Sequence, residues 1–268
     1  MAHFSCGGAE NAMMPMFRLS QGQLNLLETC PRQFQRTYLE QRRVPPTPNQ
    51  QEGLRWGEQF HQILQQQALD LPLSELLSAD EVLAQTVKKL MALAPELFCS
   101  GEQTTRLAEH SRACPLDQGL LTVIYDLLLF GAGRAWIVDW KTYREPQNRR
   151  KLAQNWQTRL YQYVLAETSA YVPAQIVMVY CFVKRGSKPT QLHFNYSDAL
   201  HRQNEQDLKK LIQELSIYRD AYLKQQTPFP HRPHCVMDCD ISQRGTVPEK
   251  SPNTGLLNFA EIEEISWG

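Results

Sequence analysis

Apolar side chains recur at helical spacing in the first hundred residues. Ser20 and Gln23 form a predicted capping box ahead of such a series, so a helix is expected to begin there. Pro31 is expected to break or restart that helix, because proline lacks a backbone N–H and fits the first turn. The proline-rich stretch 44–51 is interpreted as a loop.

Two further helices are predicted before residue 100. One covers about 54–68, where Phe60, Ile63 and Leu64 form an apolar stripe and His61 lies at its edge. The next is predicted to open at Ser78, which is followed by another apolar series. The first hundred residues are therefore expected to be mainly helical.

The pattern changes to that of strands after Gly101. Apolar and polar residues alternate over 107–111, as in a half-buried strand. Two β-prone runs follow at 120–130 and 135–141, separated by the glycine-containing segment 131–133. We expect these two runs to be strands joined by a tight turn.

Strands and helices then interleave. A helix is predicted from roughly Ala153 to Thr168, followed by a strand over 175–183 and, after a turn, a strand over 190–196. A long helix capped by Ser197 comes next. This alternation indicates an α/β layered core.

The predicted domain organisation is simple. Residues 1–16 are small, polar and aperiodic, and are expected to be disordered. A single domain is predicted over 17–240, with a helical part of about 17–100 and an α/β core of about 101–226. The proline-containing segment 241–268 is expected to be an irregular tail.

Composition narrows the class of protein. The chain has 268 residues, of which 42% are hydrophobic, enough to fill a core. No apolar run is long enough for a membrane helix and no signal peptide is recognisable, so we expect a cytoplasmic protein with no membrane partner. Seven scattered cysteines favour reduced thiols over a disulfide framework.

Charge is balanced overall and concentrated locally. Lysine plus arginine equals aspartate plus glutamate at 28 each, so the net charge does not indicate a polyanionic partner. Between Lys141 and Arg159, however, six basic residues accompany the single acid Glu145. This basic stretch predicts either a phosphate-binding groove or a solvated helix face.

The strand over 135–141 carries the clearest candidate chemistry. Asp139 and Lys141 are two residues apart and therefore share one face of that strand. Asp126 lies within the preceding apolar strand, and pairing of the two strands would bring it toward Asp139. Two neighbouring carboxylates repel each other unless a cation lies between them, and oxygen ligands suit Mg²⁺ or Mn²⁺. Metal-assisted phosphodiester hydrolysis is the reaction class that these groups indicate.

The order of these motifs resembles that of a known family. The resemblance covers roughly 17–240 and rests on these residues: Leu19-Ser20, Leu24, Cys30-Pro31 with Phe34 and Tyr38, Gly57 with His61, Asp126, Asp139-Trp140-Lys141-Thr142, and Gln157 with Tyr161. The chain is similar to the RecB-like nucleases of the PD-(D/E)XK superfamily. That resemblance implies a restriction-endonuclease-like α/β fold, with a central mixed β-sheet flanked by helices and a helical N-terminal region.

The resemblance also implies roles for individual residues. It gives His61, Asp126 and Asp139 as metal ligands, with the main-chain carbonyl of Trp140 as a further oxygen, and Lys141 as the catalytic lysine. Gln157 and Tyr161 are implied to support the site and to contact lysine or phosphate.

Three of these positions have plainer interpretations. His61 is otherwise a histidine at the edge of an amphipathic helix, and Gln157 and Tyr161 are otherwise packing and solvated neighbours one turn apart. Glu109, on the strand before Asp126, is interpreted as a surface acid rather than a metal ligand.

The chain departs from the family pattern at two places. Val123-Ile124-Tyr125 precede Asp126 where the family usually has a glycine. Many relatives hold an iron-sulfur cluster on four cysteines, whereas here Cys30, Cys235 and Cys239 lack a fourth, so a cluster is not expected. His231 or His234 completing a zinc site with those cysteines is the less favoured alternative.

The predicted function is that of a Mg²⁺- or Mn²⁺-dependent DNA nuclease. The resemblance implies an exonuclease that acts on single-stranded or frayed DNA in repair or recombination, with a helicase or recombination protein as a candidate partner. Two alternatives stay open: a nuclease-fold module that binds DNA or a helicase without cutting, and a globular protein in which the motif is coincidental. The two are distinguished by cleavage assays and by whether Asp126 and Lys141 lie together.

Overall fold

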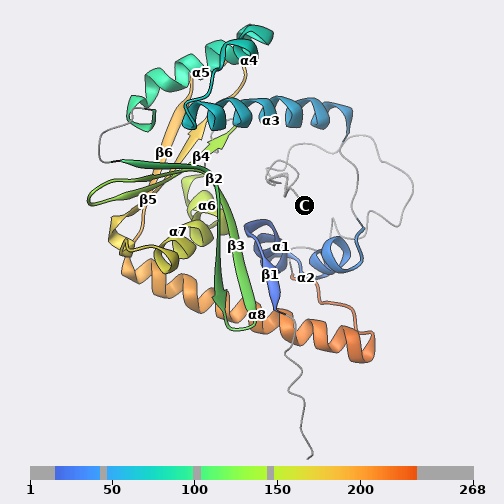
Figure 1. Cartoon of the computed structure of the whole chain (residues 1–268). Helices are drawn as coiled ribbons and strands as arrows, with labels where there is room; N and C mark the ends of the chain where they lie inside the picture. The colour runs from blue at the N-terminus through green and yellow to red at the C-terminus, as the bar shows by residue number, and fades with distance from the viewer. Residues whose placement is uncertain (1–15, 43–46, 99–103, 144–147, 234–268) are drawn as a thin grey trace, which may run out of the picture.

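A mixed six-stranded sheet forms the centre of the protein. The computed structural model describes residues 16–42, 47–98, 104–143 and 148–233. The strands are β1 (Phe17–Leu19), β2 (Thr105–Leu116), β3 (Gly119–Phe130), β4 (Ala135–Lys141), β5 (Ile176–Phe182) and β6 (Thr190–Asn195). This sheet, with helices on both faces, confirms the expected fold class (Figure 1).

The sheet combines antiparallel pairs of consecutive strands with parallel pairs. The order is β1-β3-β4-β5-β6, and β2 pairs with β3 off this path. β2, β3 and β4 run antiparallel in succession, with the Gly131 N–H bonded to the Arg134 carbonyl at the β3–β4 turn. β4 and β5 are parallel, and the chain between them forms helices on one face of the sheet.

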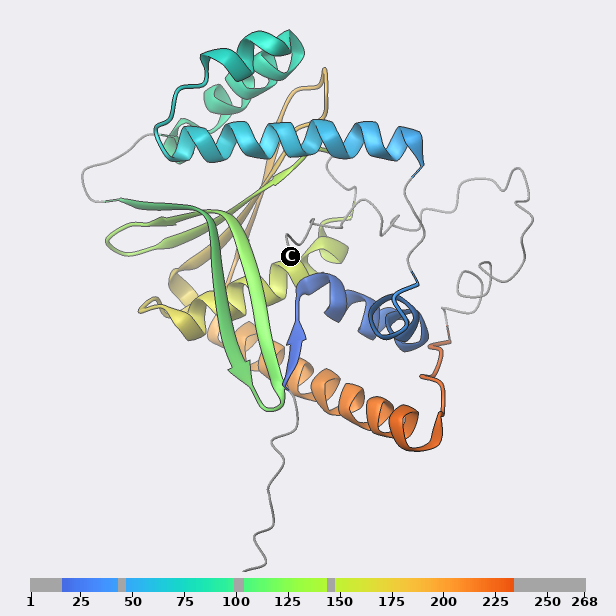
Figure 2. The same ribbon diagram turned by 45° about the vertical axis from the view of Figure 1, so that its right-hand side comes forward.

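The helices form two layers around the sheet. They are α1 (Gln21–Thr29), α2 (Pro31–Phe34), the π-helix η1 (Gln35–Leu39), α3 (Pro48–Ala68), α4 (Ser74–Ala79), α5 (Glu81–Leu93), α6 (Arg149–Gln154), α7 (Trp156–Thr168) and α8 (Asp198–Gln225), with 3₁₀ turns η2 (Pro95–Leu97) and η3 (Pro173–Gln175). The α3–α5 layer covers one face, and α1, α7 and α8 cover the other (Figure 2).

Alternating side chains of the strands supply both hydrophobic cores. In β3, Leu128 joins the core beneath α7 and α8, whereas its neighbours Leu127 and Leu129 join the core beneath α3 and α5. In β4, Ile137 and Val138 divide in the same way. The sheet is therefore buried on both faces, and its polar side chains in the interior stand out as candidates for function.

Two helices before β2 begin at residues other than those predicted. α3 begins at Pro48, inside the predicted loop 44–51, because the Thr47 N–H donates to Gln50 Oε1 at 2.7 Å and caps the helix early. The predicted start at Ser78 is also wrong. The helix α5 starts at Glu81, and its cap is Asp80, whose carboxylate accepts the Leu83 N–H at 3.0 Å.

The predicted helix after β4 is divided in two. Asn155 ends α6 and caps α7, since its side-chain oxygen accepts the Gln157 N–H at 2.8 Å. The predicted helix start at Ala153 therefore lies four residues after the start of α6 and three residues before the start of α7. β1 was not predicted: it has three residues and pairs in parallel with Gly119–Leu121 at the start of β3.

Two predicted caps agree with the structure. Ser20 donates its N–H to Gln23 Oε1 at 2.8 Å, and the Ser197 side chain accepts the Leu200 N–H at the start of α8. Nearly all of the predicted terminal regions 1–16 and 241–268 lie outside the described residues, so the domain division stays a prediction. Within the described ranges, the model contains no helix that is both long and apolar enough to cross a bilayer.

We predict that the core at Leu128 contributes strongly to stability. The side chain is fully buried between β3 and the α7–α8 layer, so Leu128→Ala should lower the free energy of unfolding by about 2–5 kcal/mol. The matched change Leu223→Ala, at a side chain 65% exposed on α8, should change it by less than about 0.5 kcal/mol. Urea denaturation of both variants measures the difference, and equal losses would contradict the assigned core.

Candidate functional site

The site begins where β3 and β4 separate. Their ladder runs from Phe130–Ala135 to Leu127–Val138 and stops before Asp126. Beyond that point the Trp140 main-chain N–H donates to Asp126 Oδ2 at 2.7 Å, so a buried side chain takes the place of a backbone partner. The carboxylate is thereby held in the fork between the two strands, on an otherwise apolar part of the sheet.

Helix α3 brings an imidazole to this carboxylate. His61 Nδ1 lies 3.5 Å from Asp126 Oδ2, and the imidazole is partly exposed. One turn earlier, Gly57 faces the end of β4: a Cβ added there would lie 3.1 Å from Thr142 Oγ1. The glycine thus permits the close approach of α3 that places His61 over the fork.

Glu109 of β2 completes a group of three potential ligands. One ligand atom from each of His61, Glu109 and Asp126 lies within 4.8 Å of the others. The Glu109 side chain is exposed, as the surface interpretation predicts, but it belongs to this group all the same. The alternation of apolar and polar residues along β2 did not indicate that Glu109 belongs to this group. His61 lies on α3, about fifty positions earlier in the sequence.

The Asp139–Lys141 pair forms the other half of the site. Lys141 Nζ lies 2.8 Å from Asp139 Oδ2, and both residues are buried. Gln157 of α7 donates from Nε2 to Asp139 Oδ1 at 2.7 Å. Gln157 thus holds one of the predicted ligand carboxylates, and its expected contact with lysine or phosphate stays a prediction.

Tyr180 of β5 lies behind the lysine. Lys141 Nζ is 5.8 Å from the centre of the Tyr180 ring, and the Tyr180 hydroxyl and Thr158 Oγ1 are 2.9 Å apart. Burial raises the pKa of the Tyr180 hydroxyl well above its usual value, and the nearby Asp139 charge acts in the same direction. This tyrosine is therefore neutral. It lies beside Lys141, and the sequence did not indicate it as part of the site.

Tyr161 and Trp140, the other two predicted site residues, pack against aromatic side chains. Tyr161 is fully buried, its ring packs edge-on against Tyr125, and its carbonyl accepts the Tyr125 hydroxyl at 3.0 Å. The Trp140 indole stacks on Phe98 in the α3–α5 core. Their roles in the site, through the Tyr161 side chain and the Trp140 carbonyl, stay predictions.

The basic stretch is only partly available to a substrate. Arg159 stacks on the Trp156 ring at 3.9 Å and pairs with Asp207 of α8, so this guanidinium joins α7 to α8. Arg149 packs on the Phe194 ring at 4.7 Å and donates to the His193 carbonyl. Arg150 and Lys151 on α6 are exposed. Aromatic and acidic neighbours thus engage Arg149 and Arg159, whereas Arg150 and Lys151 remain exposed candidates for a phosphate contact. Arg144 lies outside the described residues.

The cysteine region is described only in part. Cys30 Sγ lies 3.9 Å from His231 Nδ1, a pairing that the less favoured zinc alternative includes. Cys235, Cys239 and His234 lie outside the described residues, so neither the iron-sulfur nor the zinc prediction is tested.

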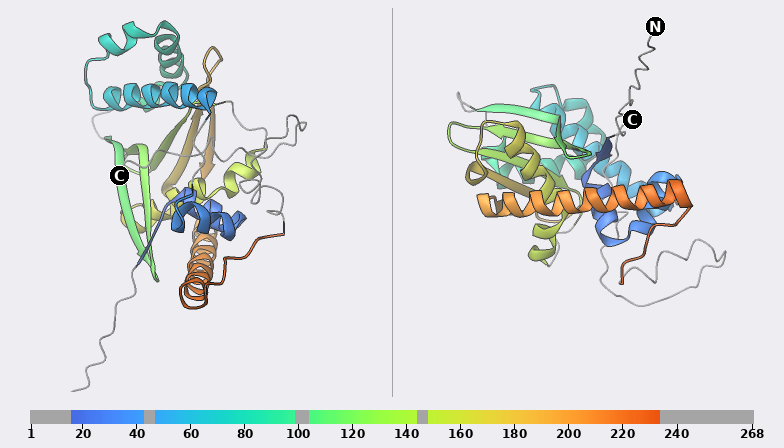
Figure 3. Two further views of the ribbon diagram at one scale, coloured as in Figure 1. Left: turned by 90° about the vertical axis from the view of Figure 1, so that its right-hand side faces the viewer. Right: turned by 90° about the horizontal axis from the view of Figure 1, so that it is seen from below.

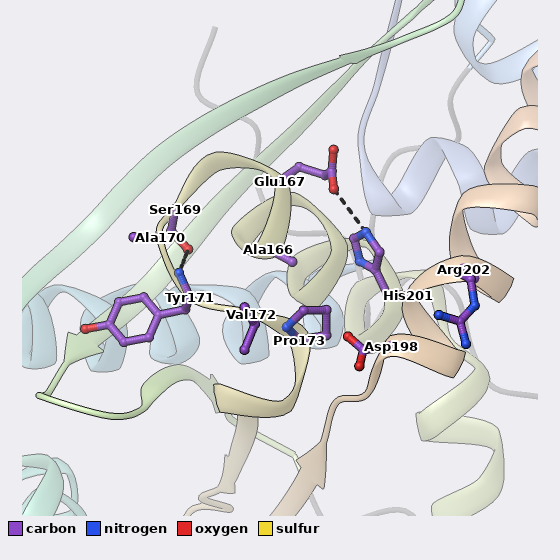
Figure 4. Close-up of a pocket in the computed structure, with 10 residues that line it drawn as sticks. All are labelled: Ala166, Glu167, Ser169, Ala170, Tyr171, Val172, Pro173, Asp198, His201 and Arg202. Carbon is purple, nitrogen blue, oxygen red and sulfur yellow. Dashed lines mark hydrogen bonds and ion pairs between the residues drawn. The ribbon is translucent and has the colours of Figure 1, made fainter.

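A hollow of about 300 Å³ lies elsewhere, between the end of α7 and the start of α8. Figure 4 shows the Glu167 and His201 side chains pointing toward each other among the lining residues, with His201 Nε2 and Glu167 Oε1 3.0 Å apart. None of the predicted site residues lines this hollow. The catalytic candidates instead lie at the fork of β3 and β4, between α3 and α7.

The donor set fits a divalent cation. One imidazole nitrogen and two carboxylates converge at the fork, and a third carboxylate, Asp139, stands on the neighbouring strand. Carboxylate oxygens suit Mg²⁺ and Mn²⁺, and an added imidazole is compatible with Mn²⁺. Buried Asp126 and the neighbouring Glu109 would repel each other without a positive charge between them.

Comparison with known proteins gives the family of the chain. The chain resembles a proposed exonuclease from Eubacterium rectale, with 12% identity, a TM-score of 0.50, and coverage of 95% of this chain and 97% of that one. A second solved structure, SSO0001, is also 12% identical and covers 75% of each chain, at a TM-score of 0.35. No curated protein matches the sequence. A family model for the PD-(D/E)XK nuclease superfamily matches residues 18–244, so the chain belongs to the PD-(D/E)XK nuclease superfamily.

Proposed function

We propose that this protein is a divalent-metal-dependent deoxyribonuclease of the RecB-like branch. The observation that carries the proposal is the convergence of His61, Glu109 and Asp126 beside the Asp139–Lys141 pair, in a chain of a nuclease superfamily. These groups supply ligands for a cation and a fixed positive charge next to it. Both promote hydrolysis of a phosphodiester, because they stabilise the negative charge that develops on the phosphate.

The proposed roles divide between two sides of the fork. His61 and Asp126 hold Mg²⁺ or Mn²⁺, with Asp139 and the Trp140 carbonyl completing its ligands. The bound cation would polarise a phosphate oxygen and lower the pKa of a water molecule. Lys141 positions that water and stabilises the negative charge that develops on the phosphate.

Gln157 and Tyr180 restrict the positions of Asp139 and Lys141. Gln157 holds one oxygen of Asp139 at 2.7 Å and so fixes the orientation of the carboxylate. The neutral Tyr180 ring packs near the ammonium of Lys141 and limits the positions that the lysine can adopt. Tyr161 supports α7 from the core side. Preorganisation of this kind aims charge at the reacting phosphate without rearrangement during the reaction.

The proposed substrate is a single-stranded or frayed DNA end, in repair or recombination, and the action is exonucleolytic. Support comes from the family and from exposed Arg150 and Lys151 on α6, which can contact backbone phosphates without reading sequence. A helicase or recombination protein is the proposed partner, and the cytoplasm the proposed location.

We predict that cleavage depends on the metal and on both halves of the site. Asp126→Asn keeps the size and an acceptor for the Trp140 N–H but removes a ligand charge, and Lys141→Ala removes the ammonium. Each should reduce cleavage of end-labelled single-stranded DNA by about 100-fold or more in Mg²⁺ or Mn²⁺, and chelator should abolish it. Lys224→Ala, at an exposed α8 lysine, serves as the control and should cleave as the wild type does.

Circular single-stranded DNA separates the modes of action. An exonuclease leaves the circle intact while degrading a linear strand of the same sequence. Binding of DNA by the wild type without cleavage in either metal would instead favour the non-cutting module.

We further predict that the close approach of α3 is required for metal binding. Gly57→Leu would force a side chain toward Thr142, displace α3 and move His61 away from Asp126, so Mn²⁺ affinity should fall by about tenfold or more. Gly53→Leu lies one turn earlier on the same helix, with nothing within 4 Å of an added Cβ, and should bind Mn²⁺ normally. Calorimetric Mn²⁺ titration compares them, and equal affinities would contradict the role of Gly57.

A further inference from the structure

Glu109 has a backbone conformation that is rare for its residue type. Its φ angle is +46°, in the left-handed region, although it lies within β2. A glutamate there is strained, because its Cβ crowds the neighbouring carbonyl oxygen, and glycine or asparagine adopts this region far more readily. Such strain persists only when surrounding structure maintains it, and it concentrates at functional sites.

The strand register sets Glu109 against another acid. β2 and β3 pair at Ala108–Leu127 and again at His110–Tyr125, so Glu109 and Asp126 occupy the position between, where the ladder is interrupted. Like charges directly opposite each other across a strand pair destabilise a sheet. Strain and charge repulsion thus fall on the same pair of residues, and both are unfavourable unless a cation is bound there.

Glu109 lies beside the two residues proposed to hold the ion. One ligand atom of Glu109 lies within 4.8 Å of a ligand atom of both His61 and Asp126. Asp139, on the neighbouring strand, has each of its oxygens within 2.8 Å of a donor, one on Lys141 and the other on Gln157. The side chains that converge most closely on the cation position are therefore those of His61, Glu109 and Asp126.

We propose that Glu109 is a ligand of the same divalent ion as His61 and Asp126, and that its strained backbone serves to aim its carboxylate at that ion. The inference rests on the proposed metal-dependent function and adds a residue that the sequence did not assign. It has a distinctive consequence: replacing Glu109 by glycine relieves the strain while removing the ligand. Stability without metal and affinity for metal should therefore change in opposite directions.

Three variants test this proposal on the full chain. Glu109→Gln removes the charge but not the strain, and should weaken Mn²⁺ binding about tenfold or more while raising the metal-free melting temperature less than Glu109→Gly does. Glu109→Gly should weaken binding equally and raise the metal-free melting temperature by about 2–4 °C. Asp117→Gly, at an exposed turn residue with φ +50°, should give a smaller rise, because aspartate adopts this conformation readily in a turn, and should leave Mn²⁺ affinity unchanged.

Calorimetric Mn²⁺ titration and thermal unfolding in chelator supply the two readouts, neither of which needs nuclease activity. Wild-type Mn²⁺ affinity in Glu109→Gln would overturn the ligand assignment, and a metal-free melting temperature of Glu109→Gly no higher than that of Glu109→Gln would overturn the role of strain. Asp126→Asn separates this failure from that of the proposed function. If it too binds Mn²⁺ like the wild type, the metal site itself is wrong.

Discussion

The hydrogen bond from the Trp140 N–H to Asp126 Oδ2 determines the geometry of the candidate site. It stands where β3 and β4 stop pairing, so the sheet opens into a fork without leaving a buried donor unsatisfied. The fork places one carboxylate on each strand, beyond the last backbone pair of the ladder. A fully paired ladder would fill this space with backbone contacts.

The two helical layers act on this fork from opposite faces. α3 lies on one side of the sheet and α7 on the other (Figure 3). α3 brings His61 to Asp126 through the close contact at Gly57, and α7 brings Gln157 to Asp139. The hydrophobic cores on the two faces hold the helices in place, so the polar groups meet without contributing much stability themselves. The site is therefore positioned by packing that lies outside it.

Stability and function are in tension at Glu109. A left-handed glutamate opposite a buried aspartate is unfavourable in the metal-free protein, and it is maintained by a long hairpin with many ladder bonds on both sides. The same hairpin contains Asp117, also left-handed, at a turn where that conformation is ordinary. The left-handed conformation of Glu109 has no such local explanation, because Glu109 lies within strand β2 and not at a turn.

The sequence alone determined which strands carry Asp126, Asp139 and Lys141, and period-two alternation placed the last two on one face. Local hydrogen bonding likewise determined the caps at Ser20 and Ser197. Only the tertiary structure decided that Glu109 joins His61, that Gln157 binds Asp139, and that Arg159 is engaged by α8. These contacts join residues far apart along the chain, through strand register and helix docking, which local patterns do not encode.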